Sequence, residues 1–560
     1  MQTADQSAEP SPAANDTREW VVLARAAAHE LAPPISAAIA FIAGLVLLNS
    51  AAQPALPGRL EALMQAWPLV VVELSHFMAS VVGVFLILVS GGLWRRLDGA
   101  YWLALTLLVV GALFSLSKAL DYEEAIGLAA GALILAPCHS AFFRRSELAQ
   151  VVARGPWALG LVFALAAMVW IFLMSYDRTP YQDELWWTFL RDAEASRSIR
   201  AVAAAIVAGL LALGLAAIAP SRARVSPEAL ATMHKQAEQA FANAEQARGE
   251  ANLIYLGEHD AVFTASGETL VLFRARGSHL IAMGDPIGKT TERAEALLQF
   301  HALADRKAAN PVLYSVSGAL LETVVDLGYA IRKIGESAVV DLATFSLDGA
   351  ARAKLRNVRN KLSREGYVVT VAAPSDPIDW PALKRVSDAW LEAQAGREKA
   401  FSLGRFHEAY LARFPIVTVA RAGEAPIAFA NLWPTPDHGD IAVDLMRHAP
   451  DAPKGVMDFL FVEAILWAKN AGFKAFDLGM APLSGLSASR YAPLMSKLGA
   501  AIFERAEYVY GFQGLRAYKQ KFGPQWRPLF IAAPAHVSLP LALLDVGLLT
   551  AGGWLGPLKS

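Results

Sequence analysis

Cysteine is almost absent from this 560-residue chain, which contains a single one, Cys138. No disulfide can therefore form within the chain, and this composition is compatible with a reducing compartment. An excess of charge of one sign is also lacking, because 50 basic and 51 acidic residues leave a formal net charge of −1. This balance argues against a protein that binds polyanions over its whole surface, so any contact with nucleic acid must come from a local basic face.

The N-terminus lacks the basic and then apolar pattern of a cleaved signal peptide. Residues 1–17 are polar and rich in Ala, Ser and Pro, which is typical of disordered segments. We therefore expect residues 1–30 to form a disordered N-terminus on the cytoplasmic side. The first hydrophobic segment should then remain in the protein as a membrane anchor.

The first part of the chain contains long hydrophobic segments, and apolar residues make up 55% of the full sequence. Within residues 31–220, about six segments are long enough, or nearly so, to cross hydrocarbon as helices. These segments are residues 35–52, 68–92, 99–117, 125–143, 157–176 and 199–219.

The loops between these segments indicate an orientation. Arginine pairs at 95–96 and 144–145 follow the second and fourth segments. Because arginines in short loops prefer the cytoplasmic side, both termini and the region after residue 220 are predicted to be cytoplasmic. Glu73 and His76 lie inside the second segment, where ionisable groups are costly. A lipid-handling role and ordinary helix packing explain these two residues equally well.

The second part of the chain begins with an Ala/Glu/Gln-rich stretch that predicts a connecting helix over residues 221–250. Residues 251–350 then alternate short apolar runs with turn residues and continue as helix, strand, helix and strand, which predicts a first α/β unit. The segment GDPIG at 284–288 lacks the spacing of a P-loop or of a dinucleotide-binding loop, so it predicts a turn.

Residues 351–535 predict a second unit with a similar order of elements. Three strands, a helix that starts near Pro453 and a further strand follow one another, the strands being residues 416–421, 427–433, 441–447 and 474–478. This order is similar to the core of the GNAT acyltransferase fold. Residues 536–560 are apolar but interrupted by Pro540, and we expect them to pack on the domain or lie along the bilayer.

Several longer blocks carry a more specific signal. In chain order they are ELSHFMASVVG, KALDYEEA, GDPIG, FANLWP, VDLMRH, FDLGMAPLSGL and GFQGLRAYKQKFGPQW. Together they closely resemble the lysylphosphatidylglycerol synthase family, the aminoacyl-phosphatidylglycerol synthases, over most of residues 70–535. The resemblance implies a multi-span α-helical membrane region followed by an α/β domain of two tandem GNAT acyltransferase-like units.

Enzymes of this family transfer an aminoacyl group from aminoacyl-tRNA to phosphatidylglycerol. The resemblance thus implies a bacterial inner-membrane aminoacyltransferase whose partners are aminoacyl-tRNA, phosphatidylglycerol and the bilayer. A lysyl group is the first expectation for the donor, with an alanyl group as the alternative. The product would make the membrane less anionic and weaken its attraction for cationic antimicrobial peptides. Two alternatives stay open: a related transferase with another lipid acceptor, and a lipid flippase or membrane scaffold with a degenerate transferase domain.

The predicted catalytic pair is Asp444 and Arg447, which stand three residues apart in VDLMRH. In a regular strand this spacing points them to opposite faces, so they can cooperate only if the strand ends or bulges between them. The resemblance places both residues in the active site. Asp444 would hold the substrate amino group or assist proton transfer, and Arg447 would bind phosphate or developing negative charge. Composition alone favours an ordinary salt bridge at the end of a strand.

Further candidates surround this pair. Asn431 could donate to the ester carbonyl, and Asp477 could bind the aminoacyl amine. Arg516 and Lys519 lie among aromatic residues, a pattern that suits a tRNA acceptor end or a lipid phosphate. The resemblance singles out Lys519, because the family's LRAYK block carries a lysine there. Each of these residues could instead have a purely structural role.

A basic helix between the two units offers a separate phosphate-binding surface. Four of its basic residues are Arg352, Arg356, Arg359 and Lys361. Such a helix face is usually just solvated. Contact with a lipid phosphate or with the tRNA backbone is an equally good interpretation here.

No cofactor and no metal are expected, because an aminoacyl ester is already activated for transfer. The segment DAPKGVMD at 451–458 also lacks the glycine-rich basic run with which coenzyme A-binding members of the GNAT fold hold pyrophosphate. Coenzyme A is therefore not the expected donor.

Overall fold

The computed structural model describes residues 12–52, 69–119, 121–144 and 227–550, with gaps at 308, 394–397, 399 and most of 488–511, and a few positions between 162 and 209. The chain divides into a helical unit before residue 225 and an α/β unit after it. Each unit has its own packed core.

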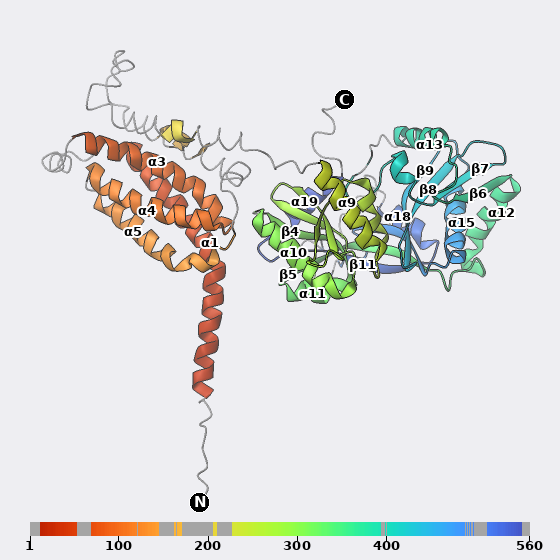
Figure 1. The fold of residues 1–560 in the computed structure, drawn as a ribbon, viewed down its shortest axis with the longest axis horizontal. Helices are drawn as coiled ribbons and strands as arrows, with labels where there is room; N and C mark the ends of the chain where they lie inside the picture. The colour runs from red at the N-terminus through yellow and green to blue at the C-terminus, as the bar shows by residue number, and fades with distance from the viewer. Residues whose placement is uncertain are drawn as a thin grey trace, which may run out of the picture. The chain divides into compact units, whose positions relative to one another are not determined.

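The helical unit includes the α-helices α1 (Pro12–Ala52), α3 (Leu69–Trp94), α4 (Asp98–Ala119) and α5 (Tyr122–Leu135) and the short 3-10 helix η1 (Ala136–Ala141). Helix α1 begins well before the first apolar segment, and its first turns extend beyond the other helices (Figure 1). The expectation of a disordered segment up to residue 30 is therefore wrong from Pro12 onward. The stretch TREWVVLARAAAHEL is rich in Ala, Leu, Arg and Glu, which favour helix.

Four stretches of this unit are long and apolar enough to cross a membrane: His29–Ser50, Phe77–Trp94, Asp98–Ser117 and Tyr122–Ala141. They coincide with the first four predicted segments. The fourth stretch changes from α-helix to 3-10 helix where Pro137 removes a backbone donor. The predicted segments 157–176 and 199–219 lie mostly outside the described residues, as do the side chains of Glu73 and His76.

The α/β unit opens with α9 (Pro227–Ala242), which is shorter than the predicted connecting helix. After Ala242 the chain turns, with Gln246 at a positive φ of 50°, and enters the 3-10 helix η3 (Gly249–Leu256). Gly249 is needed at this point, because a Cβ there would lie 2.3 Å from the Cβ of Ala442 in the sheet. Helix η3 can therefore approach the sheet closely.

All eleven strands of this unit belong to one sheet, ordered β1-β2-β3-β4-β11-β5-β10-β9-β8-β7-β6. Five strands precede residue 350: β1 (Asp260–Phe263), β2 (Leu270–Arg276), β3 (His279–Met283), β4 (Asn310–Ser317) and β5 (Tyr329–Asp341). Six follow it: β6 (Tyr367–Ala372), β7 (Ile416–Arg421), β8 (Ala428–Pro434), β9 (Asp440–His448), β10 (Ala475–Pro482) and β11 (Gln525–Pro534).

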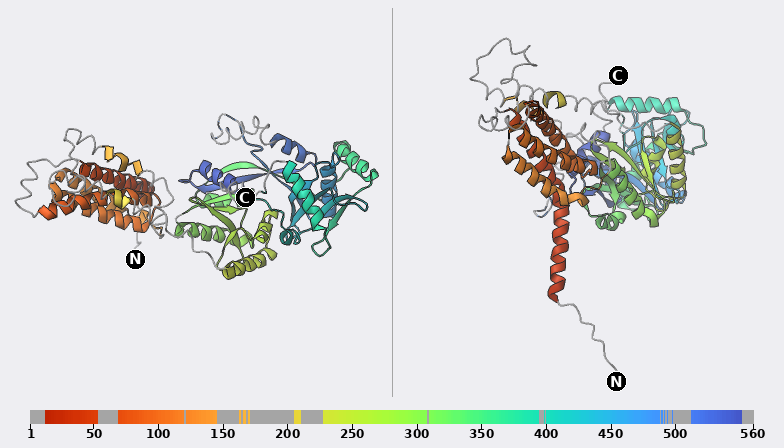
Figure 2. Two further views of the ribbon diagram at one scale, coloured as in Figure 1. Left: turned by 90° about the horizontal axis from the view of Figure 1, so that it is seen from above. Right: turned by 60° about the vertical axis from the view of Figure 1, so that its left-hand side comes forward.

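The helices of this unit cover both faces of the sheet (Figures 1 and 2). They are α10 (Arg293–Arg306), α11 (Leu321–Asp326), α12 (Ala353–Arg364), α13 (Trp380–Ala393), α14 (Glu408–Leu411), α15 (Val456–Asn470), α18 (Phe512–Gln520) and α19 (Leu539–Thr550). Strand β8 shows the alternation that places a core on each face. Phe429 and Trp433 join one buried cluster, whereas Ala430 and Leu432 join the cluster beneath α15.

The two halves of the unit, residues 251–350 and 351–535, exchange their last strands. Strand β11 of the second half lies between β4 and β5 of the first half and is antiparallel to both. Strand β5 of the first half pairs in turn with β10 of the second half. Each half therefore completes the sheet of the other, and the predicted pair of tandem α/β units forms one continuous sheet.

The apolar C-terminal segment packs on the domain over residues 539–550, as one of the two expected arrangements requires. Leu539, Ala542 and Val546 of α19 are buried in the core that both halves share. Asp545 accepts a hydrogen bond from His279 Nδ1 at 2.7 Å, which attaches the helix to the end of β3.

The exchange predicts that the first half cannot fold alone. Residues 225–350 produced separately should be insoluble or unfolded, because β4 and β5 would each lose the strand between them. Co-expression with residues 351–560 should restore a folded complex, with uncut 225–560 as the control. Circular dichroism and size-exclusion chromatography would test this. A folded monomer of 225–350 alone would contradict it.

Candidate active site

The parallel strands β9 and β10 separate at their carboxyl ends. They pair at three positions only, the last being Ala442 opposite Asp477. Beyond this point β9 continues to His448 and β10 to Pro482 without pairing to each other. Helix α15 connects the two strands. The result is an opening in the sheet, bordered by polar residues of both strands.

A bulge in β9 turns the two predicted catalytic residues to one face. Ala430 faces Met446 and Leu432 faces Val443, so Asn431 stands opposite two residues instead of one. The Asn431 side chain stabilises the bulge: its Oδ1 accepts from Leu445 N at 2.9 Å. Asp444 and Arg447, which are three residues apart, can therefore lie on the same face of β9 because the strand bulges between them.

Asp444 is the centre of a buried hydrogen-bond network and is 5% exposed. Its Oδ1 accepts from Gly404 N at 2.7 Å, and its Oδ2 accepts from Tyr410 OH and Asn431 Nδ2, both at 3.0 Å. Trp433 Nε1 in turn donates to the Tyr410 hydroxyl at 2.8 Å. These contacts attach the segment around residues 404–410 to β9.

Burial raises the pKa of Asp444 from 3.8 to about 6, although the hydrogen bonds from Asn431, Gly404 and Tyr410 oppose this shift. The nearby charge of Arg447 opposes it as well. At neutral pH the carboxyl is therefore mostly ionised.

Arg447 is 3% exposed, and its charge is matched within the protein. One guanidinium nitrogen donates to the Ser387 hydroxyl of α13, and Nη2 lies 2.6 Å from Glu398 Oε2. The guanidinium also stacks over the Trp390 ring, 5.5 Å from its centroid. Arg447 thus joins α13 to β9 on the same face as Asp444.

The β10 side of the opening is formed by Asp477 and Lys519. Asp477 Oδ1 accepts from Ser337 Oγ at 2.5 Å and from Gly479 N at 2.7 Å. Lys519 of α18 is 5% exposed and donates to the carbonyls of Gly479 and Met480 at 2.9 and 3.0 Å. Burial lowers the pKa of Lys519 to about 8, against the opposing charge of Asp477.

The remaining predicted residues lie in other contacts. Arg516 donates to Glu336 and stacks 4.2 Å from the centroid of the Trp526 ring. On α12, Lys361 is 58% exposed beside Glu365.

The three predicted arginines of the basic helix bind other parts of the protein. Arg352 donates to the Lys521 carbonyl at 2.6 Å. Arg356 donates to the Gly349 carbonyl at 3.2 Å, and Arg359 pairs with Glu463 of α15. Within the described part of the chain, these contacts do not join the three arginines to the Asp444 network.

A second polar group in this unit joins Asp477 to four residues for which the sequence predicted no role in the site. We name it the central polar cluster, and it consists of Arg248, Glu250, Asp285, Asp440 and Asp477. Arg248 and Glu250 lie where a helix was expected, and Asp285 lies within the GDPIG turn. The run of acidic and basic residues on both sides of Gly249 was the available signal, but its meaning depends on the fold.

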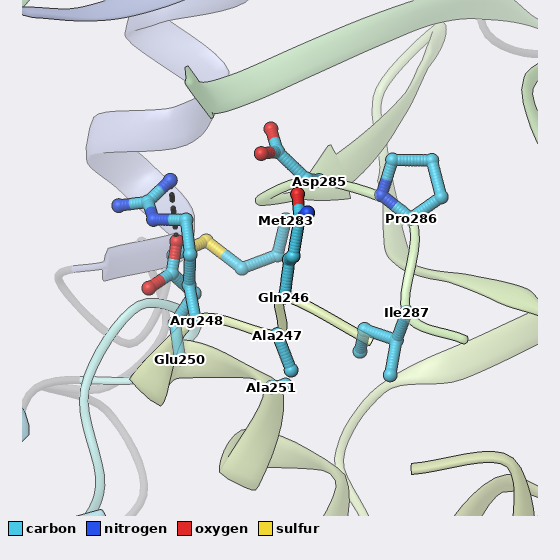
Figure 3. Close-up of a pocket in the computed structure, with 9 residues that line it drawn as sticks. All are labelled: Gln246, Ala247, Arg248, Glu250, Ala251, Met283, Asp285, Pro286 and Ile287. Atoms are coloured by element: carbon cyan, nitrogen blue, oxygen red, sulfur yellow. Dashed lines mark ion pairs between the residues drawn. The ribbon is translucent and has the colours of Figure 1, made fainter. Parts of the chain in front are cut away.

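The cluster borders a small cavity with about 10 Å³ of space for water-sized molecules. Figure 3 shows the Arg248 guanidinium beside the Glu250 carboxylate, with the Met283 side chain directed toward this pair. Asp285 and Ile287 of the GDPIG turn line the cavity too. The predicted turn is present, and it forms one wall of the cavity.

The parallel strands β9 and β10, which separate at their carboxyl ends and are joined through a helix, define the chain as a protein of the GNAT acyltransferase fold class. The family model described as phosphatidylglycerol lysyltransferase, C-terminal, matches residues 239–533. The chain belongs to this family, which confirms the resemblance seen in its sequence blocks.

Relatives match over different lengths. A phosphatidylglycerol lysyltransferase of Bacillus subtilis is 31% identical over 549 residues, which are 96% of this chain and 62% of that protein. One from Staphylococcus epidermidis is 33% identical over 296 residues, 53% of this chain and 35% of that protein. The chain thus spans less than two thirds of these relatives.

A solved structure is similar to the α/β unit. It is a C-terminal domain from Agrobacterium fabrum, provisionally described as a lysylphosphatidylglycerol synthetase. The alignment has 35% identity and a TM-score of 0.52, and it covers 58% of this chain and 98% of that domain.

Gly404→Ala should destabilise the chain, because the new Cβ would lie 2.1 Å from Asp444 Oδ2. We expect the free energy of unfolding to fall by about 1–3 kcal/mol, the usual effect of overpacking. Gly514→Ala in α18, with no atom within 4 Å of the new Cβ, is the control. Thermal unfolding of both variants in detergent would show the difference, and equal melting temperatures would contradict the prediction.

Asp444 should also make stability depend on pH. Its folded pKa of about 6 exceeds the ordinary 3.8, so the folded chain keeps a proton that the unfolded chain releases. The contribution of Asp444 to the free energy of unfolding therefore falls by about 3 kcal/mol as pH rises through this window, and then stays constant. The difference in melting temperature between wild type and Asp444→Asn should therefore change as pH rises from 3.8 to about 6. Parallel curves would contradict the assignment.

Proposed function

We propose that this chain transfers an aminoacyl group from aminoacyl-tRNA to phosphatidylglycerol at the cytoplasmic face of a bacterial inner membrane. The observation that carries the proposal is the family match over residues 239–533, which includes the whole opening between β9 and β10. The four apolar helices support attachment to the membrane that holds the lipid.

The reaction is a transesterification. A glycerol hydroxyl of the lipid attacks the ester carbonyl of aminoacyl-tRNA and forms a new C–O bond. The bond between the carbonyl carbon and the ribose oxygen then breaks, and the hydroxyl proton ends on that ribose oxygen. The protein must orient the two substrates and stabilise the oxyanion that forms between these steps.

Lys519 suits the second task. Two of its ammonium N–H groups are directed to β10 carbonyls, and we assign the third to the developing oxyanion. A positive charge that is fixed in a buried site stabilises such an anion more than it would in water.

Asp444, Asn431 and Arg447 are assigned as positioning residues, because their polar atoms already bind other protein groups. They hold β9 in its bulged form and attach α13 and the segment around Gly404 to it. Asp477 faces the opening and remains our candidate for the α-amino group of the donor.

Arg516 and the basic residues of α12 remain candidate contacts for phosphate groups of tRNA or lipid. These residues are Arg352, which directly precedes α12, and Arg356, Arg359 and Lys361 within it. To bind a phosphate, each arginine would have to give up its present contact within the protein. Lys361 is more exposed and would not.

A transfer of lysine would lower the negative charge of the membrane and thereby its attraction for cationic antimicrobial peptides. The alternative functions are a transferase with another lipid acceptor, and a flippase or scaffold with a degenerate transferase domain. The intact VDLMRH and LRAYK blocks favour an active transferase over a degenerate one.

Lipid mass spectrometry of a host without aminoacyl lipids would test the proposal. Expression of the wild-type chain should produce an aminoacyl-phosphatidylglycerol whose mass increment identifies the amino acid. Lys519→Met should reduce this lipid at least tenfold at equal membrane levels. Lys521→Met is the matched control, because this lysine is 42% exposed and pairs with Asp458. An unchanged lipid profile with the wild type would refute the proposed activity.

A further inference from the structure

Helix α19 has two apolar faces, and the protein covers only one of them. The covered face consists of Leu539, Ala542, Val546 and Leu549, which are buried. On the other side of the helix, Leu541 is 58% exposed and Leu544 is 59% exposed. Leu548, four residues further on, is half-buried. Because residues three and four apart share one side of a helix, Leu541, Leu544 and Leu548 form a continuous stripe, which we name the outer leucine face.

This face differs from the other exposed apolar residues of the α/β unit. Among the described residues of this unit, Leu541 and Leu544 are the only two large, strongly exposed apolar side chains that share a helix. The others lie one to an element or outside the named elements, and they are Leu298 in α10, Val325 in α11, Val368 in β6, Leu515 in α18 and Tyr491. Scattered apolar residues are normal on a protein surface, whereas a contiguous apolar stripe indicates an interaction surface.

The charges near the outer leucine face are compatible with an anionic surface. Asp545 is the one acidic residue of α19, and its carboxylate is already bound. Its Oδ2 accepts from His279 Nδ1 at 2.7 Å, and its Oδ1 lies 3.8 Å from Arg276 Nε. These contacts hold Asp545 toward the turn between β2 and β3. The stripe itself is therefore uncharged, and Arg276 supplies a cation beside the helix.

We propose that the outer leucine face of α19 lies on the phospholipid bilayer and docks the α/β unit on the membrane that contains its lipid acceptor. An interfacial helix binds in this way when its apolar side enters the boundary between headgroups and acyl chains. The chain has four stretches that are long and apolar enough to cross a membrane, and the α/β unit is covalently linked to them. A linked surface meets its target at high effective concentration, so even a small apolar face is sufficient.

A protein partner fits this face less well than a bilayer does. Protein interfaces are enriched in Tyr, Trp, Phe, Met and Arg, whereas Leu is under-represented among the residues that dominate binding. Between Leu539 and Thr550, α19 contains none of the enriched types. Hydrocarbon requires no directional contact, so a purely aliphatic stripe suits lipid.

Helix α19 also connects its outer face to the candidate active site. The Thr550 carbonyl at its end accepts from Ala400 N at 3.0 Å. Ala400 lies four residues before Gly404, whose N–H binds Asp444. Contact of α19 with the bilayer therefore also orients the segment that holds the Asp444 network. The inference goes beyond the proposed reaction, because it concerns how the domain is placed on its lipid.

Fluorescence quenching in nanodiscs that hold one full-length chain each measures the contact directly. Cys138→Ser removes the native cysteine, and a fluorophore is then attached at Leu544→Cys or at Leu298→Cys. Leu298 of α10 is 55% exposed and is the matched control. Lipids with a nitroxide near the headgroup should quench the label at position 544 at least about threefold more than the label at position 298.

Equal or weaker quenching at position 544 would overturn the proposal. A second copy cannot cover the face in these discs, and a contact within the chain would shield the label from lipid and give the overturning result. The measurement needs no catalysis. A wild-type chain that makes no aminoacyl lipid would therefore refute the proposed function, while the quenching would still decide whether α19 docks on the bilayer.

Transfer activity gives a second readout of docking. Leu541→Ser combined with Leu544→Ser should raise KM for phosphatidylglycerol in nanodiscs, measured as its mole fraction, at least about threefold. KM for dissolved dihexanoyl-phosphatidylglycerol, which forms no bilayer, should stay within about twofold. Leu298→Ser should change neither value. An equal rise with both lipids would indicate a structural role of the leucines and overturn the proposal, as would an unchanged KM in nanodiscs.

Discussion

The exchange of β5 and β11 is the constraint on which the rest of the α/β unit depends. Strand β11 fills the place between β4 and β5, and β5 carries β10 on its other edge. Because this pairing joins the halves into one sheet, a single buried core extends over one face of both. The opening after Ala442 and the central polar cluster both use residues that only this joining brings together. Asp477 belongs to both regions.

Polar groups within such a core must be held by partners, and the two regions do this differently. Around Asp444 the donors are neutral and come from the surrounding loop and strand, so the carboxylate holds structure together. In the central polar cluster a charged partner takes this place, because Arg248 lies 2.8 Å from Glu250 Oε1 and among three further acidic side chains.

Local pattern was enough to predict much of this molecule. Apolar length identified four helices, and alternation with turn residues identified the meander before α15. The spacing of Asp444 and Arg447 allowed two geometries, and the choice depended on the Asn431 side chain, which a strand pattern does not reveal. The partner of Asp444 at Gly404 is 40 residues away. The strand exchange and the cluster around Arg248 depend on pairing between distant segments, and periodicity carries no information about such pairing.

The position of β11 has a consequence for synthesis of the protein. Strands β4 and β5 are made early but are not neighbours in the sheet, so a gap one strand wide remains between them. This gap is closed only by residues 525–534, almost 200 positions later than the end of β5 at Asp341. A nascent chain on the ribosome therefore exposes two unpaired strand edges until β11 emerges. Such edges favour aggregation, so the interval between the synthesis of β5 and that of β11 is a vulnerable one for this domain.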